Sequence, residues 1–475
     1  MIKLFSKKKI NTNSSKNIKK IFPWLTSIDD VYSNLCNQDI NIRIQEILAL
    51  NTYFQSKNGI KQLETLQNKL ISKGFPKDAV NIEINYFLEL FQENTLFKLL
   101  YNESAGLHLH LKDKKFINAI QIKKDFGIIR TSIGKVFIVG SANTLLPVLT
   151  SLILSYIAGN VTVVQLSSLH KECIPEFIES IPAALSNYVF FTNLSHENKN
   201  DLLILEELIT SINWNVLNVW GGNESLTYYN KIIAKNINRP RIVNMEPLTG
   251  AVLIQRDYFD NNYHKNIEKL SYSIDIMGQQ LCSSPTIGFL INENECIANN
   301  SFFEDLIISL EKRYTPDNYN EKNSINLDRM INVARDNGSK VYISKLYGNN
   351  ICIIESSNES VFMNNDSNNL LNIHERRNFL EFIRLKNFSK IPKILANIFS
   401  IYSYKETKKI QTILSFGDKN FDHEVHKLAQ LIGAYRIIDS DYVLQRYPME
   451  TLDNFNLFIE FTNTISVTGS RAENL

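Results

Sequence analysis

The stretch from Ile276 to Ile291, IMGQQLCSSPTIGFLI, contains a residue that could do covalent chemistry, Cys282. Residues 266–280 can form a helix, Pro285 cannot continue one, and residues 286–291 are an apolar run of strand length. We therefore expect the thiol in the joint between a helix and a strand. Hydroxyls and backbone N–H groups at such a joint can lower the pKa of a thiol and stabilise an oxyanion. Cys282 is thus the candidate nucleophile, and the alternative is a small buried hydrophobic residue.

The charge and cysteine content of the chain favour a partner that binds in a pocket over nucleic acid or a membrane surface. The 51 basic and 49 acidic residues give a net charge of +2, which predicts no nucleic-acid partner and no anionic membrane surface. The five cysteines form no Cys-x-x-Cys pair, so neither a disulfide framework nor a metal site is expected. A reducing cytoplasm suits this usage best.

Two segments bear on targeting. Residues 1–27 begin with a basic, polar run and have no apolar core of signal-peptide length, so a disordered basic tail is expected there. The most apolar stretch, residues 145–158, is shorter than the roughly 20 residues of a membrane span and contains Pro147. We interpret it as a buried helix.

From residue 135 onward, short apolar strands alternate with helical patterns, after a helical layer over about residues 28–100. This alternation predicts a doubly wound, mostly parallel sheet, which binds dinucleotides at the carboxyl ends of its strands. No G-x-G-x-x-G motif follows any strand, which disfavours an ordinary Rossmann dehydrogenase. The expected strands are residues 136–139, 161–164, 188–191, 216–220, 241–244 and 251–255, with helices at 145–158, 201–211 and 224–235.

Two loops fall at the carboxyl ends of these strands. The first, GSANTLLP at residues 140–147, precedes a helix, whose N-terminal N–H groups and dipole favour negative charge. Asn143 in this loop either donates a hydrogen bond to a ligand or merely caps the helix. The second, WGGNE at residues 220–224, has paired glycines that allow a phosphate to approach the backbone, although glycines also make ordinary turns.

A second α/β region follows Cys282. We expect helices at residues 302–313, 375–385 and 392–398, strands at 340–343, 351–354 and 411–416, and polar loops at 316–326 and 355–369.

Several of these segments resemble one known family. GQQLCSSP resembles the nucleophile segment of the aldehyde dehydrogenase superfamily, and its Cys-Ser-Ser-Pro form is similar to the long-chain acyl-CoA and acyl-protein thioester reductases of bacterial luminescence. GSANTLLPV, AGNVTVVQLSS and NVWGGNES resemble the family's oxyanion loop, ribose-binding strand and glycine turn, in the family's order. The resemblance covers about residues 128–291 well, and residues 433–448 echo it more faintly.

The resemblance implies a fold and a set of site residues. The fold would be α/β and aldehyde dehydrogenase-like, with two doubly wound parallel-sheet domains, a cofactor domain at 28–245 that includes the N-terminal helical layer, a catalytic domain at 246–432 and a C-terminal return segment at 433–475. Asn143 would support the oxyanion formed at Cys282. The cofactor would contact Ser141, Gln165, Ser167, Gly221 and Gly222.

Two positions depart from the family pattern. Gln165 stands where the ribose-binding strand usually carries a lysine, which removes a charge near the ribose or a 2′-phosphate. The general-base glutamate of aldehyde oxidation would fall near Val243, and Glu246 is the nearest carboxylate. Glu246 is either an acid/base, a partner for Arg241 or a cap. A missing base suits a reductase, because thioester reduction needs no activated water.

The resemblance therefore implies NADPH-dependent reduction of a long-chain acyl-CoA or acyl-carrier thioester to the aldehyde, with NADH left open as the reductant. An acyl-protein synthetase and an acyl transferase are the expected partner subunits, and the protein itself is expected to be a homo-oligomer. Two alternatives stay open: NAD(P)-dependent aldehyde oxidation with Glu246 as the base, and a non-catalytic subunit that binds acyl groups or their carrier.

Overall fold

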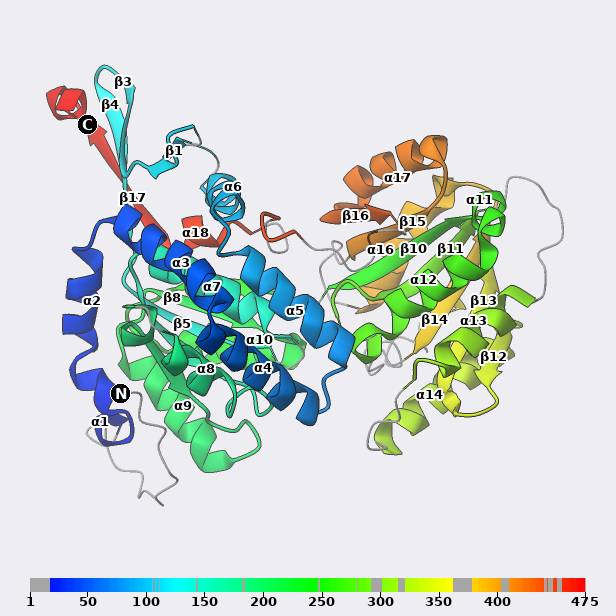
Figure 1. Ribbon diagram of the computed structural model, residues 1–475. Helices are drawn as coiled ribbons and strands as arrows, with labels where there is room; N and C mark the ends of the chain where they lie inside the picture. Colours follow the sequence, from blue (N-terminus) through cyan, green and yellow to red (C-terminus); the bar gives the residue numbers. More distant parts are fainter. Residues whose placement is uncertain are drawn as a thin grey trace. The chain divides into compact units, whose positions relative to one another are not determined.

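The computed structural model divides the chain into two compact units, residues 1–246 with 446–475, and residues 247–445. Each unit contains its own parallel sheet (Figure 1). We expected residues 433–445 in the return segment, whereas they belong to the second unit. None of the helices in the described parts of the chain combines the length and hydropathy that a membrane-spanning segment needs. The structure describes residues 18–474, apart from 105, 107, 111, 142–143, 182–183, 247, 280, 292–300, 315–320, 362–377, 403–409, 440–441, 443–446 and 451–454.

The first unit begins with a layer of helices. The expected disordered tail is wrong for residues 18–26, which form a short α-helix and a 3₁₀ turn joined at Phe22. Ile18, Phe22 and Leu25 are buried against Leu205 and Leu208, and burial of this apolar surface offsets the entropy of ordering the segment. The layer comprises α1 (Ile18–Ile21), a 3₁₀ turn (Pro23–Thr26), α2 (Ile28–Cys36), α3 (Ile40–Gln55), α4 (Lys57–Ser72), α5 (Lys77–Glu89) and α6 (Glu93–Glu103).

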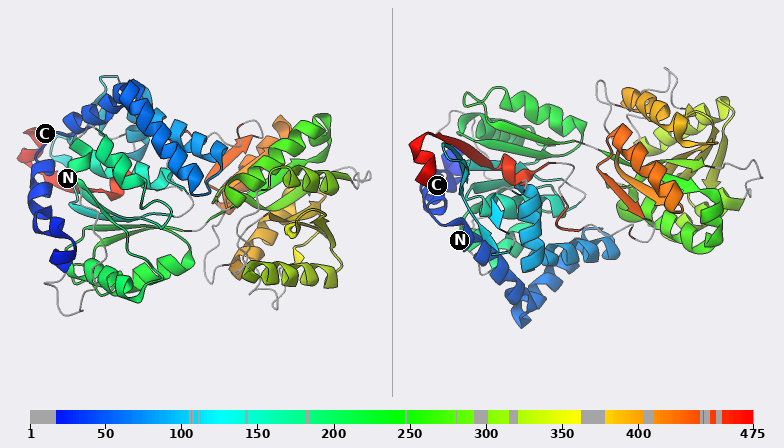
Figure 2. Two further views of the ribbon diagram at one scale, coloured as in Figure 1. Left: turned by 60° about the horizontal axis from the view of Figure 1, so that its bottom comes forward. Right: turned by 90° about the horizontal axis from the view of Figure 1, so that it is seen from above.

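The central sheet of the first unit has the strand order β7-β6-β5-β8-β9, and all neighbouring strands are parallel. In chain order this is 3-2-1-4-5, so the winding direction reverses between β5 and β8. Helices cover both sides of the sheet (Figure 2). The elements are β5 (Lys135–Val139), α7 (Leu146–Ile157), β6 (Val161–Gln165), α8 (Ile174–Ser180), a 3₁₀ turn (Ala184–Asn187), β7 (Val189–Thr192), α9 (Lys199–Ser211), β8 (Val216–Trp220), α10 (Asn223–Ile233) and β9 (Arg241–Met245).

The C-terminal segment completes the first unit. Its strand pairs antiparallel with β4 in a three-stranded sheet of order β17-β4-β3. The buried side chain of Asn160 ties the two parts of the chain together: it donates to Phe461 O at 2.8 Å and accepts from the N–H groups of Ile133 and Gly134. The elements are β1 (Leu109–His110), β2 (Lys115–Phe116), β3 (Ala119–Lys123), β4 (Phe126–Ser132), α18 (Leu457–Glu460), β17 (Thr462–Thr468) and a 3₁₀ turn (Ser470–Asn474).

The second unit contains a seven-stranded sheet of order β12-β13-β14-β11-β10-β15-β16, in which only the β12–β13 pair is antiparallel. The strands are β10 (Thr249–Gln255), β11 (Pro285–Ile291), β12 (Lys340–Ser344), β13 (Gly348–Ser357), β14 (Phe379–Leu385), β15 (Ile410–Phe416) and β16 (Arg436–Asp439). The helices are α11 (Arg256–Asn261), α12 (Tyr263–Asp275), α13 (Ser301–Glu311), α14 (Glu321–Asp336), α16 (Ile391–Tyr402) and α17 (Lys419–Ile432), with 3₁₀ turns at Ile276–Gln279 and Phe388–Lys390.

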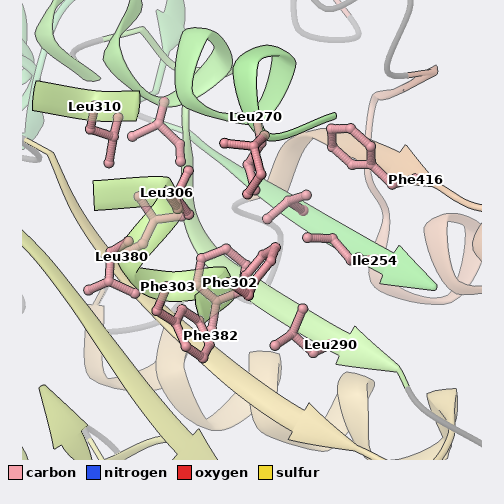
Figure 3. Packing of buried hydrophobic residues seen from close by; sticks show 14 of the residues in the cluster. Ile254, Leu270, Leu290, Phe302, Phe303, Leu306, Leu310, Leu380, Phe382 and Phe416 are labelled. Carbon is pink, nitrogen blue, oxygen red and sulfur yellow. The ribbon is translucent and has the colours of Figure 1, made fainter. Parts of the chain in front are cut away.

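Aromatic and aliphatic side chains fill one face of this sheet. Phe302 and Leu306 of α13 and Leu270 of α12 lie over Ile254 and Leu290 of the central strands (Figure 3). The opposite face is covered by α16 and α17. Because both faces are buried, the central strands read as continuous apolar runs.

Two expectations for the second unit were wrong. Residues 375–385 were expected to be helical, but Phe379–Leu385 forms the buried strand β14. Because this strand is apolar on both faces, its sequence lacks the alternation that identifies a strand. Glu381 in this strand is satisfied by Ser356 Oγ at 2.6 Å and by Val361 N–H at 2.8 Å. The polar run at 316–326 was expected to be a loop, but α14 already begins at Glu321.

Candidate functional site

Cys282 lies in a turn between the 3₁₀ segment that follows α12 and the start of β11. The turn is closed by Ser284 N–H, which donates to Leu281 O at 3.0 Å. Pro285 then begins the strand, since it cannot extend the helical segment. Cys282 is half-buried, whereas Cys173 and Cys352 are buried. This matches the joint between helix and strand that the sequence predicts.

The side chain of Gln279 anchors this turn to two neighbouring strands. Its side chain is fully buried; Nε2 donates to Pro285 O at 2.7 Å and to Phe379 O at 2.8 Å, while Oε1 accepts from Phe379 N–H at 2.9 Å. Gln279 and Gly278 both have left-handed backbones, with φ of 60° and 58°. The amide therefore anchors a sharply reversed chain to the first residues of β11 and β14.

Gly250 at the start of β10 lets the same turn approach the sheet closely. Its N–H donates to Ser284 O at 2.9 Å. A Cβ atom here would overlap the carbonyl oxygen of Ser283 and lie 2.8 Å from the carbonyl carbon of Ser284. Only glycine fits, so the position of the Cys282 turn depends on a residue that lies 32 positions earlier in the chain.

The other described cysteines differ from Cys282 in their surroundings. Burial raises the pKa of Cys352 to about 12, and it also raises the pKa of Cys173. Both thiols are thereby kept protonated, and a protonated thiol is a poor nucleophile. Cys36 is half-buried at the end of α2, and Cys296 lies outside the described residues.

In the first unit, the expected cofactor residues gather at one edge of the sheet. Ser141 follows β5, Ser167 follows β6, and Gly221 and Gly222 follow β8. Because these strands are parallel, their carboxyl ends share one edge, and β5 and β8 flank the point where the winding reverses. This is where open α/β sheets bind ligands.

The N-terminus of α7 at this edge is already capped by the protein. Glu83 of α5 accepts hydrogen bonds from Thr144 Oγ1 and from Leu145 N–H, the latter at 3.2 and 3.3 Å to its two oxygens. Pro147 in the first turn has no N–H to offer. The sequence predicts that negative charge is favoured at this helix end, and a carboxyl group of the chain itself lies there.

The N-terminus of α10 is different. Its N-cap is Gly222, which makes no side-chain cap, and a Cβ atom on Gly222 would meet nothing within 4 Å. Backbone N–H groups at an open helix N-terminus suit a phosphate group. At the carboxyl edge of this sheet, a carboxyl group therefore lies at the start of α7, whereas the start of α10 has a glycine N-cap with open space beside it.

Gln165 has a role inside the fold. It is 2% exposed, its Nε2 donates to Leu194 O at 2.7 Å and to Leu166 O at 3.2 Å, and its Oε1 accepts from Thr192 Oγ1. These bonds join the carboxyl ends of β6 and β7. The amide is thus already hydrogen-bonded within the fold, and its contact with the cofactor stays a prediction. Ser167 is half-buried, with Oγ 3.1 Å from His170 Nδ1.

Glu246 and Val243 also differ in their position relative to β9. Val243 lies inside the strand and is 1% exposed, whereas Glu246 follows its last residue and is half-buried. Glu246 thus lies at the carboxyl ends of the strands, at the same edge of the sheet as Ser141, Gly221 and Gly222. Asn143, the expected oxyanion donor, is outside the described residues.

Sequence reasoning missed three residues that shape these sites. Gln279 stands in the conspicuous GQQ string before Cys282, and this could have drawn attention to it. Glu83 and Gly250 carry no comparable signal, since each acts on a segment that is distant in sequence.

The comparisons with known proteins give the fold. No family model and no curated protein matches the sequence. Solved structures do match, among them glyceraldehyde-3-phosphate dehydrogenase GapN from Methanocaldococcus jannaschii complexed with NADP, at 17% identity and TM-score 0.65, covering 98% of this chain and 96% of that one. An NAD-dependent aldehyde dehydrogenase from Sinorhizobium meliloti matches at 12% identity and TM-score 0.67, covering 96% and 87%.

A third match is a mutant of aldehyde dehydrogenase C from Pseudomonas syringae, complexed with NAD⁺ and octanal, at 10% identity and TM-score 0.65, covering 95% and 89%. The chain therefore has the aldehyde dehydrogenase-like fold, as the sequence resemblance implies, with two parallel-sheet units.

Proposed function

We propose that the protein is a nicotinamide-dependent oxidoreductase that reduces a long-chain acyl thioester to the aldehyde through an acyl group on Cys282. The observation that carries this proposal is the half-buried thiol in a turn fixed by Gln279 and Gly250, on an aldehyde dehydrogenase-like fold. The acyl donor, coenzyme A or a carrier protein, and the preference for reduction rest on the resemblance of GQQLCSSP to the thioester reductases.

The chemistry asked of the chain begins with acyl transfer. The Cys282 thiolate attacks the thioester carbonyl carbon, the bond from that carbon to the donor sulfur breaks, and the departing thiolate takes a proton from solvent. The backbone N–H of Cys282 and the Asn143 amide are the proposed donors to the oxyanion, the latter on the resemblance alone. After hydride addition at the acyl carbon, the carbonyl re-forms, the carbon–sulfur bond to Cys282 breaks, and the aldehyde leaves.

The cofactor half of the proposal uses the carboxyl edge of the first unit's sheet. Bound NADPH, or NADH as the second candidate, would supply the hydride. Gly221 and Gly222 would accept the diphosphate at the uncapped N-terminus of α10, and Ser141 and Ser167 would line the same edge. The similar GapN and aldehyde dehydrogenase C structures are complexes with NADP and NAD⁺, which supports a nicotinamide cofactor here.

Aldehyde oxidation is a second candidate, and the place of Glu246 favours it. Oxidation requires water to attack the acyl-Cys282 thioester, and Glu246, which follows β9 at its carboxyl end, would take the proton from that water. Val243, the position that the resemblance assigns to the base, is buried and apolar. The two candidates share Cys282 and the cofactor edge, and they differ in what Glu246 does.

The decisive experiment labels the nucleophile. Incubation of the protein with isotope-labelled hexadecanoyl-CoA should place one acyl group on Cys282, which peptide mass spectrometry would locate. Addition of NADPH should then remove the adduct and release labelled hexadecanal. The Cys282→Ala variant should form no adduct, whereas Cys36→Ala, which removes the other half-buried described thiol, should behave as wild type.

A labelled residue other than Cys282, or no covalent label at all, would contradict covalent catalysis by this residue. An adduct that NADPH and NADH leave unchanged, and that water releases as the acid, would exclude the reductase and retain acyl transfer.

A further inference from the structure

Glu83 is a buried carboxyl group that the proposed mechanism does not use. It lies on α5, in the N-terminal helical layer, and its residue is 9% exposed. Within the described residues, it accepts hydrogen bonds from Thr144 and Leu145, at the end of the connection from β5 to α7. Burial without a charged partner raises its pKa to about 7, while the Thr144 and Leu145 hydrogen bonds act in the opposite direction.

A carboxyl group is costly to place here, so its presence needs a reason. Leu145 is the N-cap of α7 and makes no side-chain cap of its own. Serine, threonine or asparagine at that position would cap the helix locally and without burial of an ionisable group. The chain instead uses a side chain from 62 residues earlier, which couples the helical layer to the carboxyl edge of the sheet.

The neighbouring contacts show what this coupling holds in place. Ser141 Oγ donates to Thr144 O at 3.0 Å, and Gly140 N–H donates to Gln165 O at 2.9 Å. The chain that leaves β5 is therefore tied to β6 at Gly140, and to Glu83 through Thr144. Ser141 lies between these two anchors.

We propose that Glu83 is a positioning residue of the cofactor edge: its carboxyl group caps α7 in place of a ligand phosphate and thereby fixes Ser141 and Thr144. This inference rests on the proposed function, because it assigns the held segment to cofactor binding. It also fits the proposed place of the diphosphate at α10, since Glu83 accepts the Leu145 N–H at the start of α7 and Pro147 has no N–H to offer.

Helix α7 has no charged residue, and α4, which packs against α5, buries Leu63, Leu66 and Leu70. His170, whose ring interacts with the Ser141 backbone, is kept neutral because burial lowers its pKa to about 4.

The test compares Glu83→Ala with Glu83→Gln in the full-length protein. The glutamine keeps an oxygen for Leu145 N–H and an amide for the Thr144 hydroxyl, whereas alanine leaves both unpartnered. We expect Glu83→Ala to weaken NADPH binding about tenfold, the fold-change that corresponds to one hydrogen bond to a charged group, and Glu83→Gln to stay near wild type. Fluorescence titration with NADPH gives the Kd, and hydrogen exchange of peptides from residues 144–149 reports the anchoring directly.

Glu103→Ala is the matched control. Glu103 is also a buried carboxyl group of the first unit, but it accepts from Phe458 N–H at 3.0 Å, at the start of α18. It should lower the unfolding temperature comparably and leave the Kd for NADPH unchanged. If Glu83→Ala fails to fold, Thr144→Val removes the hydroxyl donor with little change in shape and should show the same pattern.

Three results would overturn the inference. If Glu83→Ala kept the wild-type Kd for NADPH and the wild-type hydrogen exchange, residues 144–149 would not need Glu83 to keep their place. An equal loss in the alanine and glutamine variants would show a need for negative charge rather than positioning. A Kd change in Glu103→Ala as large as that in Glu83→Ala would show general destabilisation. Failure of wild type to bind NADPH would instead refute the proposed function, while the exchange measurement would still report on Glu83.

Discussion

At the scale of single residues, burial separates groups that share a chemical type. Cys352 and Cys282 are both thiols at a strand, but burial holds the pKa of Cys352 at about 12, while Cys282 is half-buried in a turn. The same contrast separates Val243 inside β9 from Glu246 just after it. Position relative to the strand end decides which residue can reach a ligand.

Glu246 gives the prediction that separates the two candidate reactions. If the protein is a thioester reductase, Glu246→Gln should leave the rate of aldehyde formation from hexadecanoyl-CoA and NADPH unchanged. If it oxidises aldehydes, the same substitution should lower acid formation by about 100-fold or more, because the amide cannot take a proton from water. Both rates can be followed by NADPH absorbance, with the products identified by mass spectrometry.

At the scale of elements, the Cys282 turn is held by contacts that come from three strands. Gln279 bonds to the first residues of β11 and β14, and Gly250 of β10 receives the backbone of Ser283 and Ser284. The position of Cys282 therefore depends on how the central strands are paired. The residues next to it in sequence reverse the direction of the chain.

Gln279→Ala should loosen this turn. It removes three hydrogen bonds in the interior, one of them to Phe379 N–H, which should lower the free energy of unfolding by about 2 kcal/mol. The rate of Cys282 alkylation by iodoacetamide, or of its acylation, should change as well, because the thiol loses its fixed place.

Asn236→Ala is the control for this effect. Asn236 is equally buried and also makes three hydrogen bonds, to Ile209 O, Ile212 O and Asn238 N–H in the first unit. It should cost similar stability without altering the reactivity of Cys282. Equal reactivity of the Cys282 thiol in the two variants would show that Gln279 has no special hold on the turn.

At the scale of the whole molecule, buried polar groups join segments that are far apart in sequence. Asn160 holds Phe461, Arg130 donates to Thr462 Oγ1 at 2.8 Å, and Glu103 accepts from Phe458. These contacts attach the C-terminal segment to the first unit. One of them, Glu103, is a carboxyl group whose pKa burial raises to about 8.

This raised pKa sets the direction of a pH effect on stability. A carboxyl group with a pKa near 4.5 in the unfolded chain and about 8 in the folded protein binds more protons when folded, so its contribution to stability is full below pH 4.5 and is lost as the pH rises toward 8. Each such group lowers the free energy of unfolding by up to about 1.4 kcal/mol per pH unit within this window. Urea unfolding between pH 5.5 and 7.5 should show the decline, and Glu103→Gln should reduce it. A slope that is identical in the variant would contradict the assignment to Glu103.

Local patterns in the sequence determined a large part of this description. Alternating apolar strands and helices predicted the parallel sheet of the first unit, because strand and helix periods differ within a few residues. Pro285 after a helical pattern predicted that Cys282 lies between a helix and a strand, because proline cannot continue a helix. Period alone failed for Phe379–Leu385, since a strand buried on both faces has no alternation to reveal it.

The tertiary structure alone decided which groups act on these segments. Glu83 reaches Leu145 across 62 residues, and Gly250 reaches Ser283 across 33. Gln165, which stays a predicted cofactor contact, also joins β6 to β7, because Leu194 and Thr192 come to its side when the strands pair. Such contacts depend on how elements pack, and side-chain burial and hydrogen bonding have no local signature in a chain that has not yet folded.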